Sequence, residues 1–205
     1  MDNDTIPELY TIWNEAKEHI EQGNYDKAIE IYKYILIRYG DDDTAVEHAN
    51  AYLGDIYITL RQLDLAENHL KKTIDCKPDN PSYHYLLGFT HSLQRQWDKA
   101  IAEFEVAVDK VPNDYEYLRG LGWAINCSGD KVKGLAYLQK SLELAPDNIN
   151  TLTDLAVANL SSFKFHKARK YAEKALQIDP NSNMARNVLD NIKRFQKEHK
   201  RFKER

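Results

Sequence analysis

Apolar residues recur at helical spacing along most of the chain. In the first segment Leu9, Ile12, Ala16 and Ile20 lie three or four residues apart, and the pattern breaks at Gly23. This spacing places the apolar side chains on one face of an α-helix. Further stretches of the same kind predict a second helix that ends near residue 40 and eight more at about residues 45–60, 63–76, 81–94, 97–110, 115–128, 131–144, 149–162 and 165–178.

A period of 34 residues groups these helices into pairs. Pro78, Pro112, Pro146 and Pro180 are each 34 residues apart. Proline ends the preceding helix because it lacks an N–H and clashes with the turn before it. Asp, Asn or Ser follows each proline and can cap the next helix. A fixed period of this length is typical of proteins built from stacked repeats, in which each repeat contacts only its neighbours.

Small residues occupy two positions of every repeat, counted from residues 9, 47, 81, 115 and 149. A side chain of one methyl group or none lets two helices approach closely, and glycine inside a helix costs roughly 1 kcal/mol relative to alanine. We expect close helix packing to offset that cost. The eighth position holds Ala16, Gly54, Gly88, Gly122 and Ala156, and the twentieth holds Ala28, Ala66, Ala100, Gly134 and Ala168.

The first and second repeats are separated by extra residues. Ala28 and Ala66 are 38 residues apart, four more than the common period. We place the extra length in the loop at residues 41–43 and in the first helical turn after it, where Thr44 and Glu47 have the spacing of a capping box. The three adjacent aspartates of this loop could hold a divalent cation, but they lack the alternating carboxylates of an EF-hand. We therefore predict a tolerated loop insertion and no metal site.

The repeated unit resembles the tetratricopeptide repeat (TPR) family. The third copy carries the fullest set of family residues, namely Leu87, Gly88, Ala100, Phe104, Ala107 and Pro112. The first copy departs most, with Glu15-Ala16 in place of Leu-Gly and Gly40 in place of the closing proline. The resemblance covers about residues 6–180. It implies an all-α, right-handed superhelical solenoid of five helix-turn-helix repeats at about residues 6–42, 43–80, 81–114, 115–148 and 149–182. Residues 183–205 should add a capping helix and a basic tail.

Composition favours a soluble cytoplasmic protein. Hydrophobic residues make up 42% of the 205, enough to fill the core of a repeat array, and the formal net charge is −4. Cys76 and Cys127 lie 51 residues apart, a spacing that indicates neither a disulfide framework nor a metal site. The N-terminal stretch Met1-Asp2-Asn3-Asp4 carries net negative charge where a secretory signal would be basic. No run of apolar residues approaches the length of a membrane span.

The resemblance also indicates where a partner would bind. Positions 2, 5, 9 and 12 of each repeat line the concave groove of TPR arrays, and on a purely structural protein they should be polar. Here several are aromatic, and Tyr, Trp and Arg are enriched at binding hot spots. The alternative is that these rings pack against the second helix or the next repeat. The candidate groove residues are Trp13, Lys17, Asp55, Tyr85, Phe89, Arg119, Trp123, Asn126 and Val157.

One familiar TPR ligand is excluded by the residues present. Members that bind the acidic C-terminus of cytosolic chaperones carry a clamp of Lys, Asn, Asn, Lys and Arg at set groove positions. The best windows here offer Trp13, Lys17 and Tyr52, or Arg119, Trp123 and Asp154, and neither fits. A groove with aromatic rings should instead prefer a peptide or helix with apolar side chains.

Nothing in the sequence indicates catalysis. Seven histidines are scattered along the chain without Cys or carboxylate companions at ligand spacing. No glycine-rich phosphate loop or nucleophile motif is present. We therefore predict that the protein is not an enzyme and has no catalytic residue, cofactor or metal.

Two alternatives concern other kinds of partner. Residues 193–205 hold seven Lys or Arg and two Glu, a local charge of +5, which leaves −9 on the other 192 residues. This tail, with Phe195 and Phe202, could dock on an anionic membrane or on nucleic acid. A solvated helix end explains the same charges, so we do not favour either contact. Self-association, with one copy filling the groove of another, is the second alternative.

Overall fold

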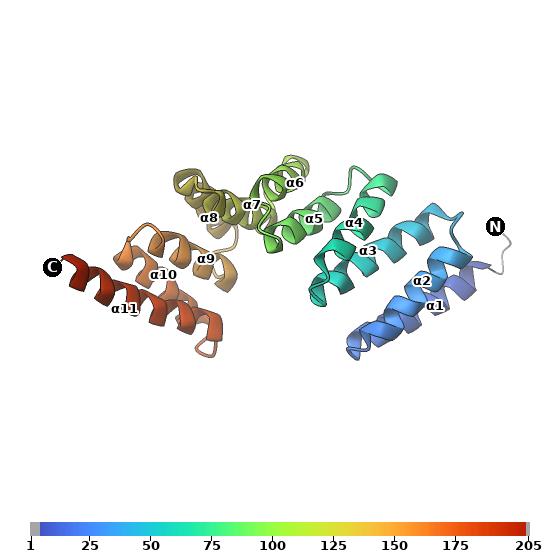
Figure 1. The fold of residues 1–205 in the computed structure, drawn as a ribbon, viewed down its shortest axis with the longest axis horizontal. Helices are drawn as coiled ribbons and strands as arrows, with labels where there is room; N and C mark the ends of the chain where they lie inside the picture. Colours follow the sequence, from blue (N-terminus) through green and yellow to red (C-terminus); the bar gives the residue numbers. More distant parts are fainter. Residues whose placement is uncertain (1–4, 204–205) are drawn as a thin grey trace. The chain divides into compact units, whose positions relative to one another are not determined.

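The computed structural model describes residues 5–203, and it is helical over most of that range (Figure 1). Side chains are described for residues 8–201, so Phe202 lies outside them. Within the described residues there are eleven helices and no strand, which confirms the all-α prediction. The helices are α1 (Thr5–Glu21), α2 (Tyr25–Arg38), α3 (Asp43–Thr59), α4 (Leu63–Cys76), α5 (Pro81–Leu93), α6 (Trp97–Lys110), α7 (Tyr115–Ser128), α8 (Lys131–Leu144), α9 (Ile149–Leu160), α10 (Phe165–Ile178) and α11 (Asn183–Lys203).

Two compact units make up the chain, residues 1–96 and 97–205. The first contains α1 to α5 and the second α6 to α11. The division falls between the two helices predicted for the third repeat, so each unit receives one of them. Each unit is described by itself.

Polar caps set the helix starts, as predicted. The Asp114 carboxylate accepts hydrogen bonds from the backbone amides of Glu116 and Tyr117 at 2.8 and 3.0 Å. Asn80 and Asn148 cap α5 and α9 in the same way. These caps satisfy amides that have no partner within the helix. The eight helices predicted between residues 45 and 178 agree with the observed ones to within two residues.

The capping box predicted at Thr44 and Glu47 is wrong. Asp42 caps α3 instead, and its carboxylate accepts from the amides of Thr44 and Ala45 at 2.9 and 3.1 Å. Glu47 is 2% exposed and binds other helices. A buried carboxylate with a lysine and a tyrosine within reach is better satisfied there than at a solvated helix start.

The core of the first unit lies between the paired helices. Ala16, Ala28 and Ala66, at the small positions of their repeats, are fully buried. Leu70 of α4 packs on Gly54 of α3, where an added methyl group would lie 2.8 Å from the leucine side chain. Buried Tyr32 of α2 stacks on Tyr52 of α3 at 5.0 Å between ring centroids.

The closest helix approach in the second unit joins α7 and α8. Gly122 and Gly134 both face the partner helix at this crossing. A Cβ atom on Gly134 would lie 2.6 Å from the backbone nitrogen of Asn126, and one on Gly122 would lie 2.8 Å from the backbone nitrogen of Leu138. Backbone atoms cannot move aside as a flexible side chain can. Glycine is therefore required at both positions.

The last helix covers the end of the second unit, which confirms the predicted capping helix. Val188 and Ile192 of α11 pack against Ala168 and Ala172 of α10. Stacked repeats need such a cover, because the terminal layer would otherwise expose its core to water. Met184, in the first turn of this helix, is 49% exposed.

The α7–α8 crossing generates the first prediction. Replacing Gly134 by Ala should lower the free energy of unfolding by about 1–2 kcal/mol, because overpacking against fixed backbone outweighs the gain in helix propensity. Urea denaturation followed by circular dichroism measures the change.

Ala136, exposed on the same helix, provides the matched control. Ala136→Gly should cost about 1 kcal/mol through helix propensity alone. If Gly134→Ala instead stabilises the protein, the two helices do not meet as described.

Candidate functional site

A pocket of about 420 Å³ opens on the first unit. It is built by α1, α3 and α5, the first helices of the first three predicted repeats. Its lining is mostly aromatic and includes two of the predicted groove residues, Trp13 and Lys17. The full set is Tyr10, Trp13, Lys17, His48, Ala51, Tyr52 and Tyr83.

Ring contacts define the walls of this pocket. Trp13 of α1 lies against His48 of α3 at 5.0 Å between ring centroids, and the Lys17 ammonium lies 5.7 Å from the centre of the Tyr52 ring. Tyr10 is 63% exposed at the edge. The Trp13 Nε1 atom is buried and has no hydrogen-bond partner among the described residues. The pocket walls are therefore mostly aromatic, and the Trp13 N–H is not exposed in them.

A buried ionic contact fixes Tyr83 at the α5 side of the pocket. The Tyr83 hydroxyl donates to Glu47 Oε1 at 2.5 Å, and Lys77 Nζ lies 2.6 Å from Glu47 Oε2. Burial raises the pKa of the Glu47 carboxyl, but the hydrogen bonds from Lys77 and Tyr83 outweigh it and leave that pKa below its ordinary value. Glu47 thus stays ionised and holds one pocket wall in place.

Three more predicted residues of the first unit lie outside this pocket lining. Asp55 of α3 is exposed, and desolvation by the surrounding protein raises the pKa of its carboxyl. On α5, Tyr85 is half-buried and Phe89 is 38% exposed. The structure does not gather these three side chains around Trp13.

The remaining predicted residues belong to the second unit. Arg119 of α7 forms an ion pair with Asp154 of α9, with 3.1 Å between Nη1 and Oδ2, and its Nη2 lies 3.5 Å from Glu116. Burial raises the pKa of Asp154 to about 6, although the Arg119 guanidinium opposes that shift. The ion pair joins the first helices of two successive predicted repeats.

Trp123, Asn126 and Val157 differ in their exposure. Trp123 is half-buried on α7. Asn126 is 8% exposed because it packs against Gly134 of α8. Val157 is half-buried and packs on the cluster that contains Ala168. Of these three, Asn126 offers the least surface to a ligand.

Two pairs of predicted groove residues, Tyr85 with Phe89 and Arg119 with Trp123, lie in different units. The first pair belongs to the first unit and the second pair to the other.

Two residues of the pocket lining, Tyr52 and Tyr83, lie outside the repeat positions predicted for the groove. Tyr52 occupies position 6, four residues after His48 at position 2, so the two share a helix face. That spacing could have identified Tyr52. Tyr83 occupies position 3 and reaches the pocket through its bond to Glu47, for which the local pattern carries no signal.

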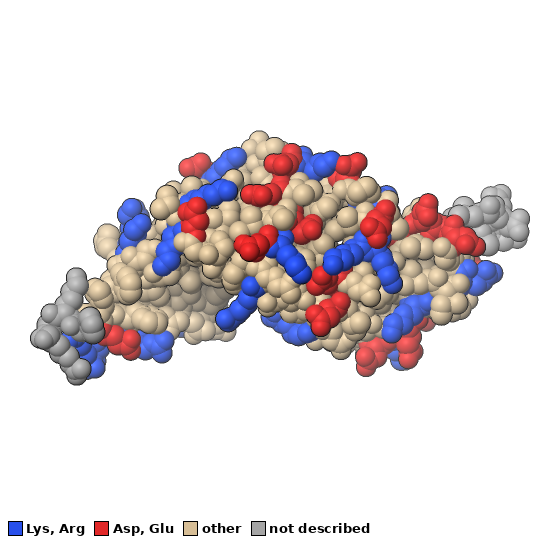
Figure 2. Space-filling view, turned by 45° about the horizontal axis from the view of Figure 1, so that its top comes forward, with Lys and Arg blue, Asp and Glu red and all other residues tan. Residues whose placement is uncertain are grey.

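Charges are mixed over the face of the molecule in Figure 2, where Lys and Arg alternate with Asp and Glu. No helix within residues 5–203 is both long and apolar enough to cross a membrane. The same part of the chain contains no cluster of three or more His, Cys, Asp or Glu suited to a metal ion.

Three models of the tetratricopeptide repeat match the chain, at residues 19–88, 92–149 and 149–182. A comparison with curated protein sequences finds no match.

Solved structures with the same fold share little sequence with the chain. MamA from Desulfovibrio magneticus RS-1 is 18% identical, with 85% of this chain and 97% of that one covered and a TM-score of 0.73. TTC0263, a thermophilic TPR protein in Thermus thermophilus, is 17% identical, with 90% and 98% covered and a TM-score of 0.72. YrrB, a TPR protein with an unusual peptide-binding site, is 20% identical, with 85% and 88% covered and a TM-score of 0.65.

The Arg119–Asp154 pair generates the second prediction. The Asp154 carboxyl should titrate near pH 6 in a ¹³C NMR experiment, and Arg119→Gln should move that midpoint higher, because it removes the favourable cation and leaves the burial. The folded pKa exceeds the ordinary 3.8, so the contribution to stability is complete below pH 3.8 and is lost as pH rises through about 6. A midpoint that falls in the variant would contradict the ion pair.

Proposed function

Because the chain belongs to the tetratricopeptide repeat family, we propose that it is a non-catalytic scaffold that binds a peptide or helix of a partner protein on its first-helix faces. The family and the fold support protein–protein interaction in general. We propose in addition that the site lies on the first helices and that the ligand carries apolar side chains.

The single observation that carries this proposal is the pocket between α1, α3 and α5. Tyr10, Trp13 and Tyr52 supply large rings that lose little conformational entropy on binding. Lys17 adds a cation beside the rings. A peptide with an apolar side chain is the ligand that matches these groups.

Two further facts are consistent with a peptide ligand. The pocket draws on three successive repeats, so an extended segment can run from α1 to α5 across their faces. YrrB, which has the same fold, is described as having a peptide-binding site. We propose that Asp55, Tyr85 and Phe89 extend this surface along the first unit, and that Arg119, Trp123 and Val157 belong to a separate contact surface on the second unit.

We place this scaffold in the cytoplasm. Cys76 and Cys127 form no disulfide, as expected in a reducing compartment.

The third prediction tests the pocket with a peptide selected on the wild-type protein from a random peptide library. Tyr10→Ala should weaken binding of that peptide by about 1–2 kcal/mol, roughly fivefold to thirtyfold in Kd, because the exposed ring is lost from the binding surface. Trp13→Phe keeps an aromatic ring at the pocket wall, although a smaller one, and should weaken binding by a smaller factor. Fluorescence anisotropy measures each Kd.

Tyr34 of α2 is the matched control. It is 47% exposed and lies outside the pocket lining, so Tyr34→Ala should leave the Kd unchanged. Equal affinity for wild type and Tyr10→Ala, or loss of binding in Tyr34→Ala alone, would reject this site. Concentration-dependent sedimentation of the unliganded protein, abolished by Tyr10→Ala, would instead identify a second copy as the occupant.

A further inference from the structure

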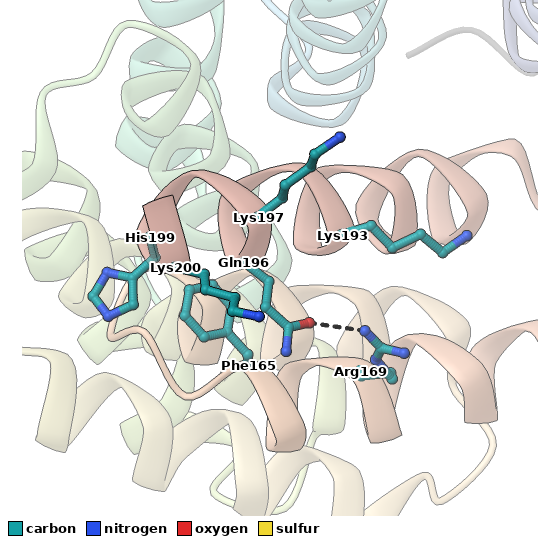
Figure 3. A pocket seen from close by; sticks show the side chains of 7 residues that line it. All are labelled: Phe165, Arg169, Lys193, Gln196, Lys197, His199 and Lys200. Atoms are coloured by element: carbon teal, nitrogen blue, oxygen red, sulfur yellow. Dashed lines mark hydrogen bonds between the residues drawn. The ribbon is translucent and has the colours of Figure 1, made fainter. Parts of the chain in front are cut away.

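A second cavity, of about 550 Å³, lies between α10 and α11 in the second unit. Phe165 and Arg169 line it from α10, and the last helix provides the rest of the wall (Figure 3). The α11 residues are Lys193, Gln196, Lys197, His199 and Lys200. None of them belongs to the predicted groove.

Every charged residue in this lining is a cation. Lys193, Lys197 and Lys200 follow one another at intervals of four and three residues, which places them along one side of α11. Arg169 faces them from α10, where its Nη2 donates to Gln196 Oε1 at 2.9 Å (Figure 3). The four cations therefore line one shallow recess that is open to solvent.

Aromatic rings form one end of the recess. Phe165 packs against the buried cluster that contains Val188 and Ile192. The His199 ring lies 5.6 Å from the Phe165 ring and stacks on Phe163 at 5.2 Å. This end is apolar and held in place by the core. A ligand that matches the recess needs negative charge for one part and an apolar group for the other.

We propose that the α10–α11 recess is a second binding site, specific for an acidic peptide segment that carries an apolar side chain. Its carboxylates pair with Arg169, Lys193 and Lys197, and its apolar side chain covers Phe165. The charge of the lining and the ring at its end select this chemistry together. This site does not depend on the pocket between α1, α3 and α5.

Geometry argues against a membrane as the occupant. Phe195, an exposed ring of this helix, is two residues from Lys193 and therefore about 200° away around α11. A bilayer could not receive that ring and the lysine row at the same time.

Charge argues against nucleic acid. The formal charge is +5 over residues 193–205 but −9 over the other 192 residues. A long polyanion bound in the recess would meet the net negative charge of the rest of the chain, whereas a short acidic segment would contact mainly the lining cations, of which Lys193 also pairs with Asp190 at 3.1 Å. The mixed charges on the face in Figure 2 likewise offer no broad cationic track.

Binding of a fluorescein-labelled peptide of alternating glutamate and leucine to the full-length protein tests this proposal, with the Kd measured by fluorescence anisotropy. The double variant Lys193→Gln, Lys197→Gln should bind it about fivefold to thirtyfold more weakly, since each partly solvated charge contact contributes on the order of 0.5–1 kcal/mol. Arg194→Gln, Arg201→Gln removes the same charge from exposed residues of α11 outside the lining, and should change the Kd less than twofold. Replacing glutamate by glutamine in the peptide should abolish binding.

Other outcomes overturn the proposal. Equal weakening by the two double variants would show attraction to net charge rather than a site. Equal binding of a glutamate–serine peptide would remove the role of Phe165. Tighter binding of an oligouridylate, or of phosphatidylserine vesicles, than of the peptide would assign the recess to nucleic acid or to membrane.

Tyr10→Ala should leave binding of the acidic peptide unchanged. Failure of the recess proposal and failure of the pocket between α1, α3 and α5 are therefore distinguishable.

Discussion

Close contact between the two helices of a repeat is the constraint on which the rest of the structure depends. At the α7–α8 crossing the backbones of Gly122 and Gly134 approach so closely that no side chain fits at either position. Fully buried Ala28 and Ala66 fill the equivalent position in the first unit. The first helices also pack on neighbouring repeats, so α3 and α9 are buried over much of their surface. The exposed side that remains is available for contacts of another kind.

That remaining face explains the character of the candidate site. Large aromatic rings such as those of Trp13 and Tyr52 are enriched in cores and interfaces, because exposure of their apolar surface to water is unfavourable. His48 packs beside them. Here they line a pocket that also includes Tyr83. The Tyr83 hydroxyl donates to Glu47, a buried carboxylate that also pairs with Lys77. A carboxylate with both oxygens satisfied holds its partners in one arrangement. Glu47 therefore links Tyr83, at the pocket wall, to the buried interior of the first unit.

Local signals in the sequence predicted the fold well. Prolines and Asx caps act within a few residues, so helix ends such as those at Asp114 and Asn148 could be read directly. The contacts that shape the site act between repeats instead. The bond from Tyr83 to Glu47 spans 36 residues and the Arg119–Asp154 bond spans 35, and no periodic pattern encodes either partner. Asn126, predicted on the groove, proved 8% exposed because Gly134 lets α8 approach it.

The most direct test of this account is site-specific photo-crosslinking in native extract, with p-benzoylphenylalanine placed at Tyr10 or at Tyr34. Both side chains are exposed, but only Tyr10 borders the pocket. A discrete crosslinked partner at Tyr10 and none at Tyr34 is the predicted result. The same partner at Tyr34 and none at Tyr10 would show that binding occurs on the second helices, and would contradict a first-helix site.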